Sequence, residues 1–354
     1  MVRVAVVGGG IFGCTTAARL SGDGHEVHLY EAKDSLLRCA SGINQFRLHR
    51  GYHYPRSPET IRECQGAVES FEKEYGPAVI PTGRHYYALA RHRSRTTPQQ
   101  YLKALSDHGL GYRVCSSEHL NMDAVELVVQ AADEPWLDVT TLRGLVWDRL
   151  KNVSVHLNTK ATASLLSACD KIVVAAYAST NAVLTDFGCE PELFQYEVCE
   201  KPVLKMPPEF QGVGIVVMDG EFCSLDPLCG TPYHVMGHVR HAIHASNIGT
   251  CPEIPDYLRF SVDHGVQRND RTAWAAFRWA GSDYIPALSG ARHIGSMYTV
   301  RAVLPNKDDT DERPTLVSKV DDRVIRVFSG KIGTAVSAAE QVASMVHAKE
   351  KIAA

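Results

Sequence analysis

The feature that most constrains this chain is a glycine triplet near its N-terminus. Val2 to Val7 has the pattern of a short buried strand, and residues 11–20 carry helix formers and small side chains. Between them, Gly8, Gly10 and Gly13 have the spacing G-x-G-x-x-G. The first glycine of such a triplet allows a tight turn, the second lets a pyrophosphate approach the backbone, and the third allows close packing of helix on strand. The triplet predicts a dinucleotide site at a helix N-terminus.

An acidic residue at the end of the next expected strand supports this interpretation. Residues 25–30 form that strand, and Glu31 closes it. A carboxylate at this position accepts hydrogen bonds from a ribose hydroxyl and disfavours a 2′-phosphate. The order strand, helix, strand and acid favours a dinucleotide site over a glycine-rich turn without a ligand. It does not separate FAD from NAD.

Composition excludes several classes of partner. A chain of 354 residues suits about two domains. Its formal net charge of −3 gives no reason to expect a nucleic acid or an anionic membrane as partner, because both require a basic face. No apolar run approaches the ~20 residues that span a bilayer. The ten cysteines include no C-x-x-C pair and no secretory leader is evident, so we expect reduced thiols and a cytoplasmic location.

The expected elements alternate between strand and helix at the start, middle and end of the chain. Residues 195–245 differ, because their short strand-like runs are broken by Gly and Pro and indicate an antiparallel sheet. The remaining expected strands are 79–90, 153–157, 171–176 and 324–328. The remaining expected helices are 58–75, 98–108, 117–120, 138–151, 252–281 and 334 to about 349.

This alternation predicts a nucleotide-binding domain assembled from separated segments, because βαβ alternation is typical of a parallel sheet. We assign residues 1–80, 130–190 and 295–354 to it. Residues 81–129 and 191–294 form the substrate domain inserted between those segments.

Four stretches carry a further signal. They are RCASGINQFRLHRGYHYP at 38–55, VVAAYA at 173–178, MYTVRAVLP at 297–305 and VFSGKIGT at 327–334. Together they resemble the D-amino-acid oxidase/glycine oxidase superfamily of FAD enzymes. The resemblance implies FAD as cofactor and an α/β fold. In that fold a Rossmann-like FAD-binding domain built from separated segments receives an α+β substrate domain containing an antiparallel sheet.

The resemblance also implies where FAD is bound. The first stretch wraps the pyrophosphate and the flavin ring, and the second lies near the adenine. The last places a helix N-terminus beside the flavin pyrimidine, where a positive dipole end stabilises the charge of the reduced ring. The expected FAD contacts are Gly8, Gly10, Ile11, Phe12, Gly13, Glu31, Ala32, Asn44, Arg47, His49, Ala176, Gly330, Lys331, Ile332, Gly333 and Thr334.

Three residues are candidates for catalysis. The resemblance implies that Arg301 binds a substrate carboxylate, for which a guanidinium offers a planar pair of donors. The alternative for Arg301 is a surface position or a structural ion pair. His49 is a candidate for contact with the flavin ring, covalent attachment to it, or a structural hydrogen bond. Tyr298 is a candidate for the substrate site or for ordinary cross-strand packing.

Four histidines at 234, 238, 241 and 244 invite a metal-site hypothesis. No cysteine pair or carboxylate cluster accompanies them, so we expect no metal.

The sequence therefore predicts an FAD-dependent oxidoreductase that oxidises the C–N bond of an amine or amino acid. A hydride would pass to flavin N5, the substrate would be small and carry a carboxylate, and O₂ or another acceptor would take the electrons. The alternatives are an FAD-dependent 2-hydroxy acid dehydrogenase, which needs a base such as His49, and a redox-neutral flavoprotein.

Overall fold

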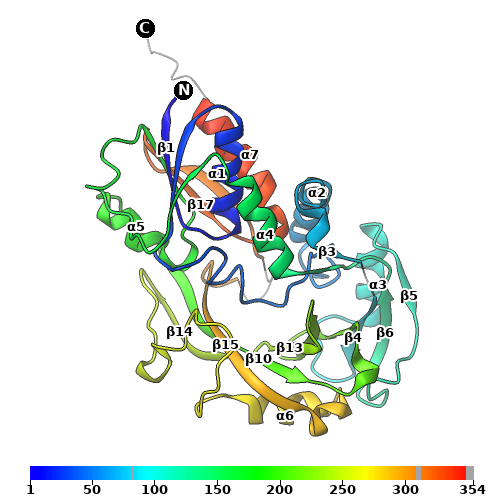
Figure 1. The fold of residues 1–354 in the computed structure, drawn as a ribbon. Helices are drawn as coiled ribbons and strands as arrows, with labels where there is room; N and C mark the ends of the chain where they lie inside the picture. Colours follow the sequence, from blue (N-terminus) through cyan, green and yellow to red (C-terminus); the bar gives the residue numbers. More distant parts are fainter. Residues whose placement is uncertain (82, 308–311, 348–354) are drawn as a thin grey trace.

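The computed structural model describes residues 1–81, 83–307 and 312–347. Two large sheets dominate it, one above the other in Figure 1. The upper sheet has six strands in the order β16-β17-β9-β1-β2-β8. All neighbouring pairs are parallel except β16 with β17. Its strands are β1 (Arg3–Val7), β2 (Glu26–Tyr30), β8 (Ser154–His156), β9 (Lys171–Val174), β16 (Leu316–Lys319) and β17 (Val324–Phe328).

Alternating side chains of β1 explain why helices cover both faces of this sheet. Val4 and Val6 are buried in the core shared with α1 (Ile11–Gly22) and α7 (Ala335–His347). Ala5 and Val7 are buried in a second core that includes Leu184 of α5 (Thr180–Asp186). Because successive strand side chains point to opposite faces, an unbroken apolar run is buried on both sides.

The lower sheet has nine strands and is mostly antiparallel. Its order is β14-β10-β13-β12-β11-β4-β6-β5, with β15 pairing along β10, and only β11 and β4 are parallel. Helix α3 (Pro98–Asp107) contributes to the core on one face, and α6 (Trp274–Ser282) contributes to the core on the other. The strands are β4 (Arg84–Ala90), β5 (Tyr112–Val114), β6 (Val125–Ala131), β10 (Phe194–Lys205), β11 (Val213–Met218), β12 (Cys223–Leu228), β13 (Tyr233–His238), β14 (Ile243–Gly249) and β15 (Arg292–Val303).

Two short strands and two helices lie beside these sheets. Strands β3 (Val79–Ile80) and β7 (Trp136–Leu137) pair with each other, while α2 (Pro58–Tyr75) and α4 (Val139–Arg149) accompany the upper sheet in Figure 1. The predicted α/β class, with a parallel sheet from separated segments and an antiparallel sheet between them, is confirmed. None of the helices in the described residues is long and apolar enough to cross a bilayer.

Two sequence predictions of helix were wrong. Residues 252–281 contain only a 3-10 turn at Asp256–Leu258 before α6 begins at Trp274. Asp263 and Gly265 have positive φ, and isolated bridges join this segment to β15, so the chain there follows a strand edge. Residues 117–120 form a turn rather than a helix.

The two-domain division remains a proposal, with one correction. Residues 295–303 were assigned to the nucleotide-binding domain. However, β15 pairs with β10 along nearly its whole length, from Arg292 to Val303. We therefore place this strand with the nine-stranded sheet.

Asp138 fixes the start of α4. Its Oδ1 accepts hydrogen bonds from the backbone N–H groups of Thr140 and Thr141, at 2.9 and 3.3 Å. Removing such a cap costs about 1 kcal/mol, because the helix N-terminus then loses partners for its N–H groups. We expect Asp138→Ala to lower the free energy of unfolding by about that amount in urea titrations. Asp148→Ala, an exposed change in the same helix, serves as the control, and an equal loss in both variants would contradict the capping role.

Candidate active site

The glycine triplet forms a turn that tolerates no side chain at its first and third positions. Gly8 has φ +113°, and a Cβ atom there would lie 2.4 Å from the carbonyl oxygen of Ala175. A Cβ atom on Gly13 would lie 1.9 Å from the carbonyl oxygen of Gly8. A Cβ atom on Gly10 would meet only the Ser41 hydroxyl, at 3.1 Å. The start of α1 is therefore bordered by backbone and one small polar side chain.

Two side chains hold this turn in place. Ser41 Oγ accepts a hydrogen bond from the Ile11 backbone N–H at 3.0 Å. Glu31 accepts from the backbone N–H of Gly9 at 2.6 Å and from that of Lys33 at 2.7 Å. An ionised carboxylate has about four acceptor positions, so Glu31 retains capacity for a ribose hydroxyl. Ser41 was not among the residues predicted from the sequence. The feature that could have identified it is a small hydroxyl side chain in the stretch that follows Glu31.

Residues 38–55, which follow β2, cross from the upper sheet to the lower one and make several buried polar contacts. Arg47 Nε forms an ion pair with Asp226 Oδ1 of β12 at 3.1 Å, and both side chains are buried. His49 Nδ1 lies 3.0 Å from Glu134 Oε1. Asn44 is tied to its own loop, because its amide donates to the Ala40 carbonyl and accepts from the Phe46 N–H. Asn44 and Arg47, which we expected to bind the cofactor, therefore already have structural hydrogen-bond or ion-pair partners.

Arg50, in the same stretch, has two carboxylate partners. Its Nη2 lies 2.6 Å from Glu72 and its Nε lies 2.9 Å from Asp133.

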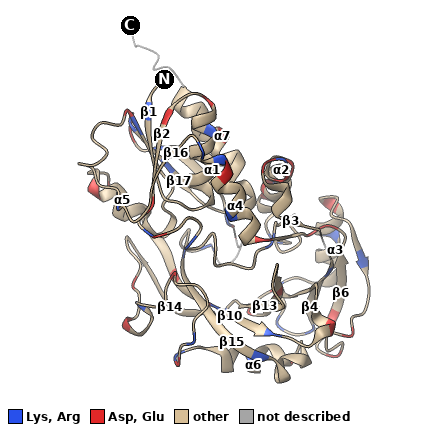
Figure 2. Ribbon diagram, viewed as in Figure 1, with Lys and Arg blue, Asp and Glu red and all other residues tan. Residues whose placement is uncertain are grey.

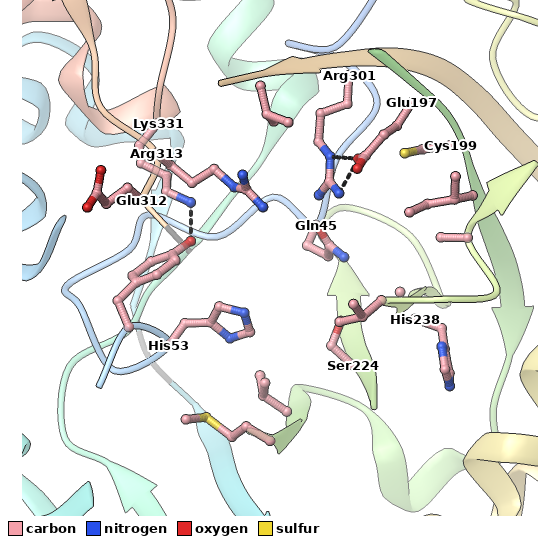
Figure 3. A pocket seen from close by; sticks show the side chains of 18 of the residues that line it. Gln45, His53, Glu197, Cys199, Ser224, His238, Arg301, Glu312, Arg313 and Lys331 are labelled. Carbon is pink, nitrogen blue, oxygen red and sulfur yellow. Dashed lines mark hydrogen bonds and ion pairs between the residues drawn. The ribbon is translucent and has the colours of Figure 1, made fainter. Parts of the chain in front are cut away.

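A cavity of about 560 Å³ lies between this stretch and the lower sheet (Figure 3). Among the residues that the structure describes, eight arginines and lysines line it, against four aspartates and glutamates, so this described part of the wall carries an excess of positive charge. Over the described chain as a whole, basic and acidic residues are interspersed on both layers (Figure 2). The described part of the cavity wall is therefore a local concentration of cations in a protein of slightly negative net charge. Such a wall favours an anionic group on the molecule it binds.

Arg301 reaches this cavity from β15 and is paired with Glu197 of β10. Its Nε lies 2.6 Å from Glu197 Oε2, and its Nη2 contacts the same oxygen. Burial opposes the charge of Arg301, but the acidic groups of Cys199 and Glu197 outweigh it and raise the arginine pKa above its ordinary value. The side chain stays 39% exposed, so part of the guanidinium faces the cavity, as Figure 3 shows.

Two other ionisable groups in this region are shifted by burial. The ammonium of Lys201, which lines the cavity, has its pKa lowered to about 8, mainly because burial disfavours the charged form. Burial raises the pKa of Asp226 to about 6, although Arg47 opposes that shift. Both groups are outside the residues that sequence reasoning had selected.

Residues 327–334, the last of the four stretches that carry the family resemblance, border the cavity. Gly330 and Lys331 line it, and Lys331 Nζ contacts the hydroxyl of Tyr54 and lies 4.1 Å from the centre of its ring. The Thr334 hydroxyl donates to the Lys331 carbonyl at 2.7 Å, in the turn that leads into α7. Of the expected contact residues of this stretch, Gly330 and Lys331 thus line the same cavity as His49 and Arg47.

Comparison with known proteins identifies the family. The family model described as "FAD dependent oxidoreductase" matches residues 3–308. The chain belongs to this FAD-dependent oxidoreductase family. It is therefore an FAD-dependent enzyme, and its resemblance to the glycine oxidase group is confirmed.

Relatives and solved structures agree with this placement. The FAD-dependent monooxygenase FPY4 of Fusarium mangiferae is 26% identical over 97% of this chain and 90% of its own. The FAD-dependent monooxygenase kojA of Aspergillus flavus is 24% identical over 98% and 86%. Glycine oxidase from Geobacillus kaustophilus has a TM-score of 0.71 at 14% identity, covering 99% of this chain and 96% of that one. L-alpha-glycerophosphate oxidase from Mycoplasma pneumoniae, solved with FAD bound, has a TM-score of 0.74 at 15% identity, covering 99% and 96%.

The residues of this FAD-dependent oxidoreductase fit the cofactor at the start of α1. Gly10 leaves the space above the helix N-terminus bordered only by the Ser41 hydroxyl, and a longer side chain would fill it. Backbone N–H groups at a helix N-terminus match the charge of a pyrophosphate. The predicted cofactor, FAD, is confirmed by the family. The individual contact residues remain predictions.

Tyr298 does not belong to the cavity of this oxidoreductase. The described residues that line the cavity do not include it, and its side chain is fully buried in a core with Phe194, Leu258 and Val300. Alternation along β15 explains the difference, because Tyr298 and Arg301 are three positions apart and point to opposite faces. We therefore remove Tyr298 from the catalytic candidates.

Three of the four histidines considered as metal ligands bond to different groups, and the ring of the fourth, His241, lies 4.4 Å from that of His238. His234 bonds the Phe210 carbonyl at 3.0 Å, His238 accepts from the Arg240 N–H, and His244 bonds Glu200 at 2.7 Å. Within the described part of the chain, no group of three potential ligands is arranged around a common point.

Proposed function

We propose that this enzyme oxidises the C–N bond of a small amine or amino acid that carries a carboxylate. The observation that supports this most strongly is Arg301, a cation fixed by Glu197 on the wall of a positively charged cavity. A guanidinium has five N–H donors, and its contacts with one carboxylate oxygen leave others directed to the cavity. The remaining donors suit the two oxygens of a substrate carboxylate.

The arrangement also suits a zwitterion. Glu197 places a negative charge beside Arg301, so an amino acid would find an acceptor for its ammonium next to a donor for its carboxylate. Glu197 itself is held by Gln195, whose amide donates to Oε1 at 2.9 Å. Because the pair is already formed, it is organised before the substrate arrives, which lowers the entropy cost of orienting the substrate.

Bound FAD would supply the two-electron acceptor, taking a hydride at N5 from the carbon that bears the nitrogen. The protein's own contribution is to place that carbon, through Arg301 at one end of the cavity, and to surround it with charged and polar groups. We retain the sequence assignment of the FAD contacts, with the pyrophosphate at Gly8–Gly13 and the ring beside His49 and Lys331. The cytoplasmic location and the use of O₂ as final acceptor also remain predictions.

The relatives raise a second candidate. FPY4 and kojA are named FAD-dependent monooxygenases, so the same cavity is a candidate for oxygen transfer to an anionic substrate. The 2-hydroxy acid dehydrogenase and the redox-neutral flavoprotein also remain as alternatives.

Anaerobic flavin reduction separates these candidates. Purified holoenzyme would be mixed with amino acids, other amines and 2-hydroxy acids, and loss of the flavin absorbance would be followed. We expect bleaching by carboxylate-bearing amines. Bleaching by hydroxy acids alone would favour the dehydrogenase. If neither class reduces the flavin and labelled oxygen from ¹⁸O₂ enters a product, the monooxygenase is favoured instead.

Arg301→Ala should selectively weaken the use of carboxylate substrates. Each hydrogen bond to a charged group contributes about 1.5–3 kcal/mol, so losing two should lower kcat/KM by about 100-fold or more. Flavin content should stay at the wild-type level. The control is a decarboxylated amine analogue of the same substrate, whose kcat/KM should change little. Equal losses for both substrates would contradict a carboxylate-binding role.

A further inference from the structure

One side of the cavity carries polar side chains to which the proposed function assigns no role. Alternate residues of β10 line the cavity, namely Gln195, Glu197, Cys199 and Lys201. Val198, between them, is buried in the core on the other face of the sheet. Because successive strand side chains point to opposite faces, Lys201 points to the same side of the sheet as Glu197, the partner of Arg301.

Lys201 belongs to a row of residues that crosses three neighbouring strands. Strand β13 lies between β10 and β12 in the sheet. Ser224 of β12 is paired with Gly237 of β13, and Val203 of β10 is paired with Val235 of β13. Two positions further along this antiparallel register, Lys201 lies opposite Gly237. The three residues of this row all line the cavity, with the glycine in the middle.

Gln45 reaches the same row from residues 38–55. A Cβ atom on Gly237 would lie 2.2 Å from Gln45 Nε2 and 2.8 Å from Ser224 Oγ. The amide and the hydroxyl therefore converge on the space above Gly237, and only a glycine at this position leaves room for both. In the view of Figure 3, the Gln45 side chain lies between Arg301 and Ser224.

These polar groups are available to a ligand. Among the residues that the structure describes, the side chains of Gln45, Ser224 and Lys201 form no hydrogen bond or ion pair with one another or with any other group. An ammonium, an amide NH₂ and a hydroxyl all donate hydrogen bonds. Burial is the main cause that lowers the pKa of Lys201 to about 8, and the charges of Arg301 and Arg47 contribute. The ammonium is therefore still mostly charged at neutral pH, and an anion beside it would offset the repulsion among the three cations.

We propose that Lys201, Ser224 and Gln45 form a subsite for a second anionic group, a carboxylate or a phosphate, on the substrate. This inference rests on the proposed function, which places the first carboxylate at Arg301. Arg301 lies opposite Glu197, so its backbone is roughly 13 Å from that of Lys201 along the strand direction. Two long side chains and a small diacid together can bridge that distance. The substrate class is thus an amine that carries two anionic groups, such as an amino diacid or an amino acid phosphate.

Equilibrium binding to the oxidised holoenzyme tests the subsite without turnover. Succinate, glutarate and 3-phosphonopropionate are compared with succinamate and glutaramate, in which an amide replaces one anionic group. Titration of the flavin absorbance gives each Kd. Because one charge-assisted hydrogen bond corresponds to about 10- to 100-fold in affinity, wild type should bind at least one doubly charged probe about 10-fold or more tightly than the amides. Tighter binding of 3-phosphonopropionate than of succinate would identify the second group as a phosphate, and the reverse as a carboxylate.

Lys201→Met removes the ammonium and keeps a long side chain. The preference for doubly charged probes should disappear, while the amides should bind as they do to wild type. The control is Lys205→Met, because Lys205 lies on the same strand, is exposed and is not among the described residues that line the cavity. This variant should keep the full preference.

Gly237→Ala tests the same subsite through its shape. The added methyl group would displace the Gln45 amide and crowd the Ser224 hydroxyl, so the preference should fall about 10-fold although Lys201 is still present. Gly290→Ala is the matched control, because a Cβ atom there would meet nothing within 4 Å. It should bind every probe as wild type does.

The outcomes separate this inference from the proposed function. Wild-type holoenzyme that binds the doubly charged probes no more tightly than the amides overturns the inference, and so does a Lys201→Met or Gly237→Ala enzyme that keeps the preference. If one variant does not fold, the other decides. Anaerobic reduction of the flavin should also be faster with aspartate, glutamate or O-phosphoserine than with asparagine, glutamine or serine. If no amine reduces the flavin, the proposed function fails, and the binding comparison still decides whether the subsite exists.

Discussion

Gly13→Ala should remove most of the FAD from the purified enzyme. A methyl group at this position would lie 1.9 Å from the carbonyl oxygen of Gly8, far inside any permitted contact. The helix must therefore move away from the turn, and the backbone N–H groups that we predict to face the phosphates move with it. Overpacking typically costs about 1–3 kcal/mol, which corresponds to a loss of about 10- to 100-fold in affinity. Flavin absorbance per protein and titration of the apoprotein with FAD would measure the effect.

Gly22→Ala is the matched control for this experiment. Gly22 ends the same helix, and a Cβ atom there would meet nothing within 4 Å. Alanine is the better helix former by about 1 kcal/mol, so this variant should keep its FAD and unfold at equal or higher urea concentration. Wild-type FAD affinity in Gly13→Ala would show that the close approach of helix and strand is not required for the cofactor.

Arg47→Ala should produce the largest loss of stability among single changes in the cavity wall. It leaves Asp226 buried without its ion-pair partner, and both side chains of this pair are almost completely inaccessible to water. Breaking a buried ion pair by removing one partner typically costs about 3–5 kcal/mol. We expect a decrease of that size in the free energy of unfolding, measured by urea titration of the holoenzyme.

Two comparisons make the Arg47 experiment specific. Arg50→Ala removes a neighbouring arginine whose partners, Glu72 and Asp133, are 39% and 62% exposed and can be solvated once it is gone. Its loss should therefore be clearly smaller. Adding Asp226→Asn to Arg47→Ala should recover part of the stability, because the uncompensated charge disappears. Equal losses in the two arginine variants, with no recovery in the double variant, would contradict this account.

The sequence predicted those parts of the fold that depend on neighbouring residues. Gly8, Gly10 and Gly13 act within a few positions of one another, so their spacing alone predicted the turn. Helix α2 was predicted with its observed bounds, Pro58–Tyr75, because Pro58 opens it and one apolar face runs through it. The segment 252–281 failed for the opposite reason. Its conformation depends on bridges to β15, which no local pattern records.

The candidate site was predictable only in part for the same reason. Arg301 could be selected from its stretch, but its partner Glu197 is 104 positions away, and Asp226 is far from Arg47 in the chain. Glu134 and Lys201 have no motif around them. Their properties arise from burial and from charges that the fold brings together, so a sequence pattern does not reveal them. Tyr298 is the opposite case. It was selected because it lies in the same stretch as Arg301, but its side chain points to the other face of β15.

The positions of the strands of each sheet along the chain have a consequence for folding during synthesis. The strands of the nine-stranded sheet lie between β4 and β15, interrupted by β8 and β9 of the six-stranded sheet, whereas the six-stranded sheet also needs β1 and β17, which lie outside that stretch. At about 5–20 residues per second, roughly 15–60 s separate the emergence of α1 from that of α7, its packing partner. During this interval the glycine turn before α1 lacks α7 and β17, so the six-stranded sheet and its helices are incomplete. The antiparallel sheet, whose last strand is β15, can thus assemble before α7 has emerged.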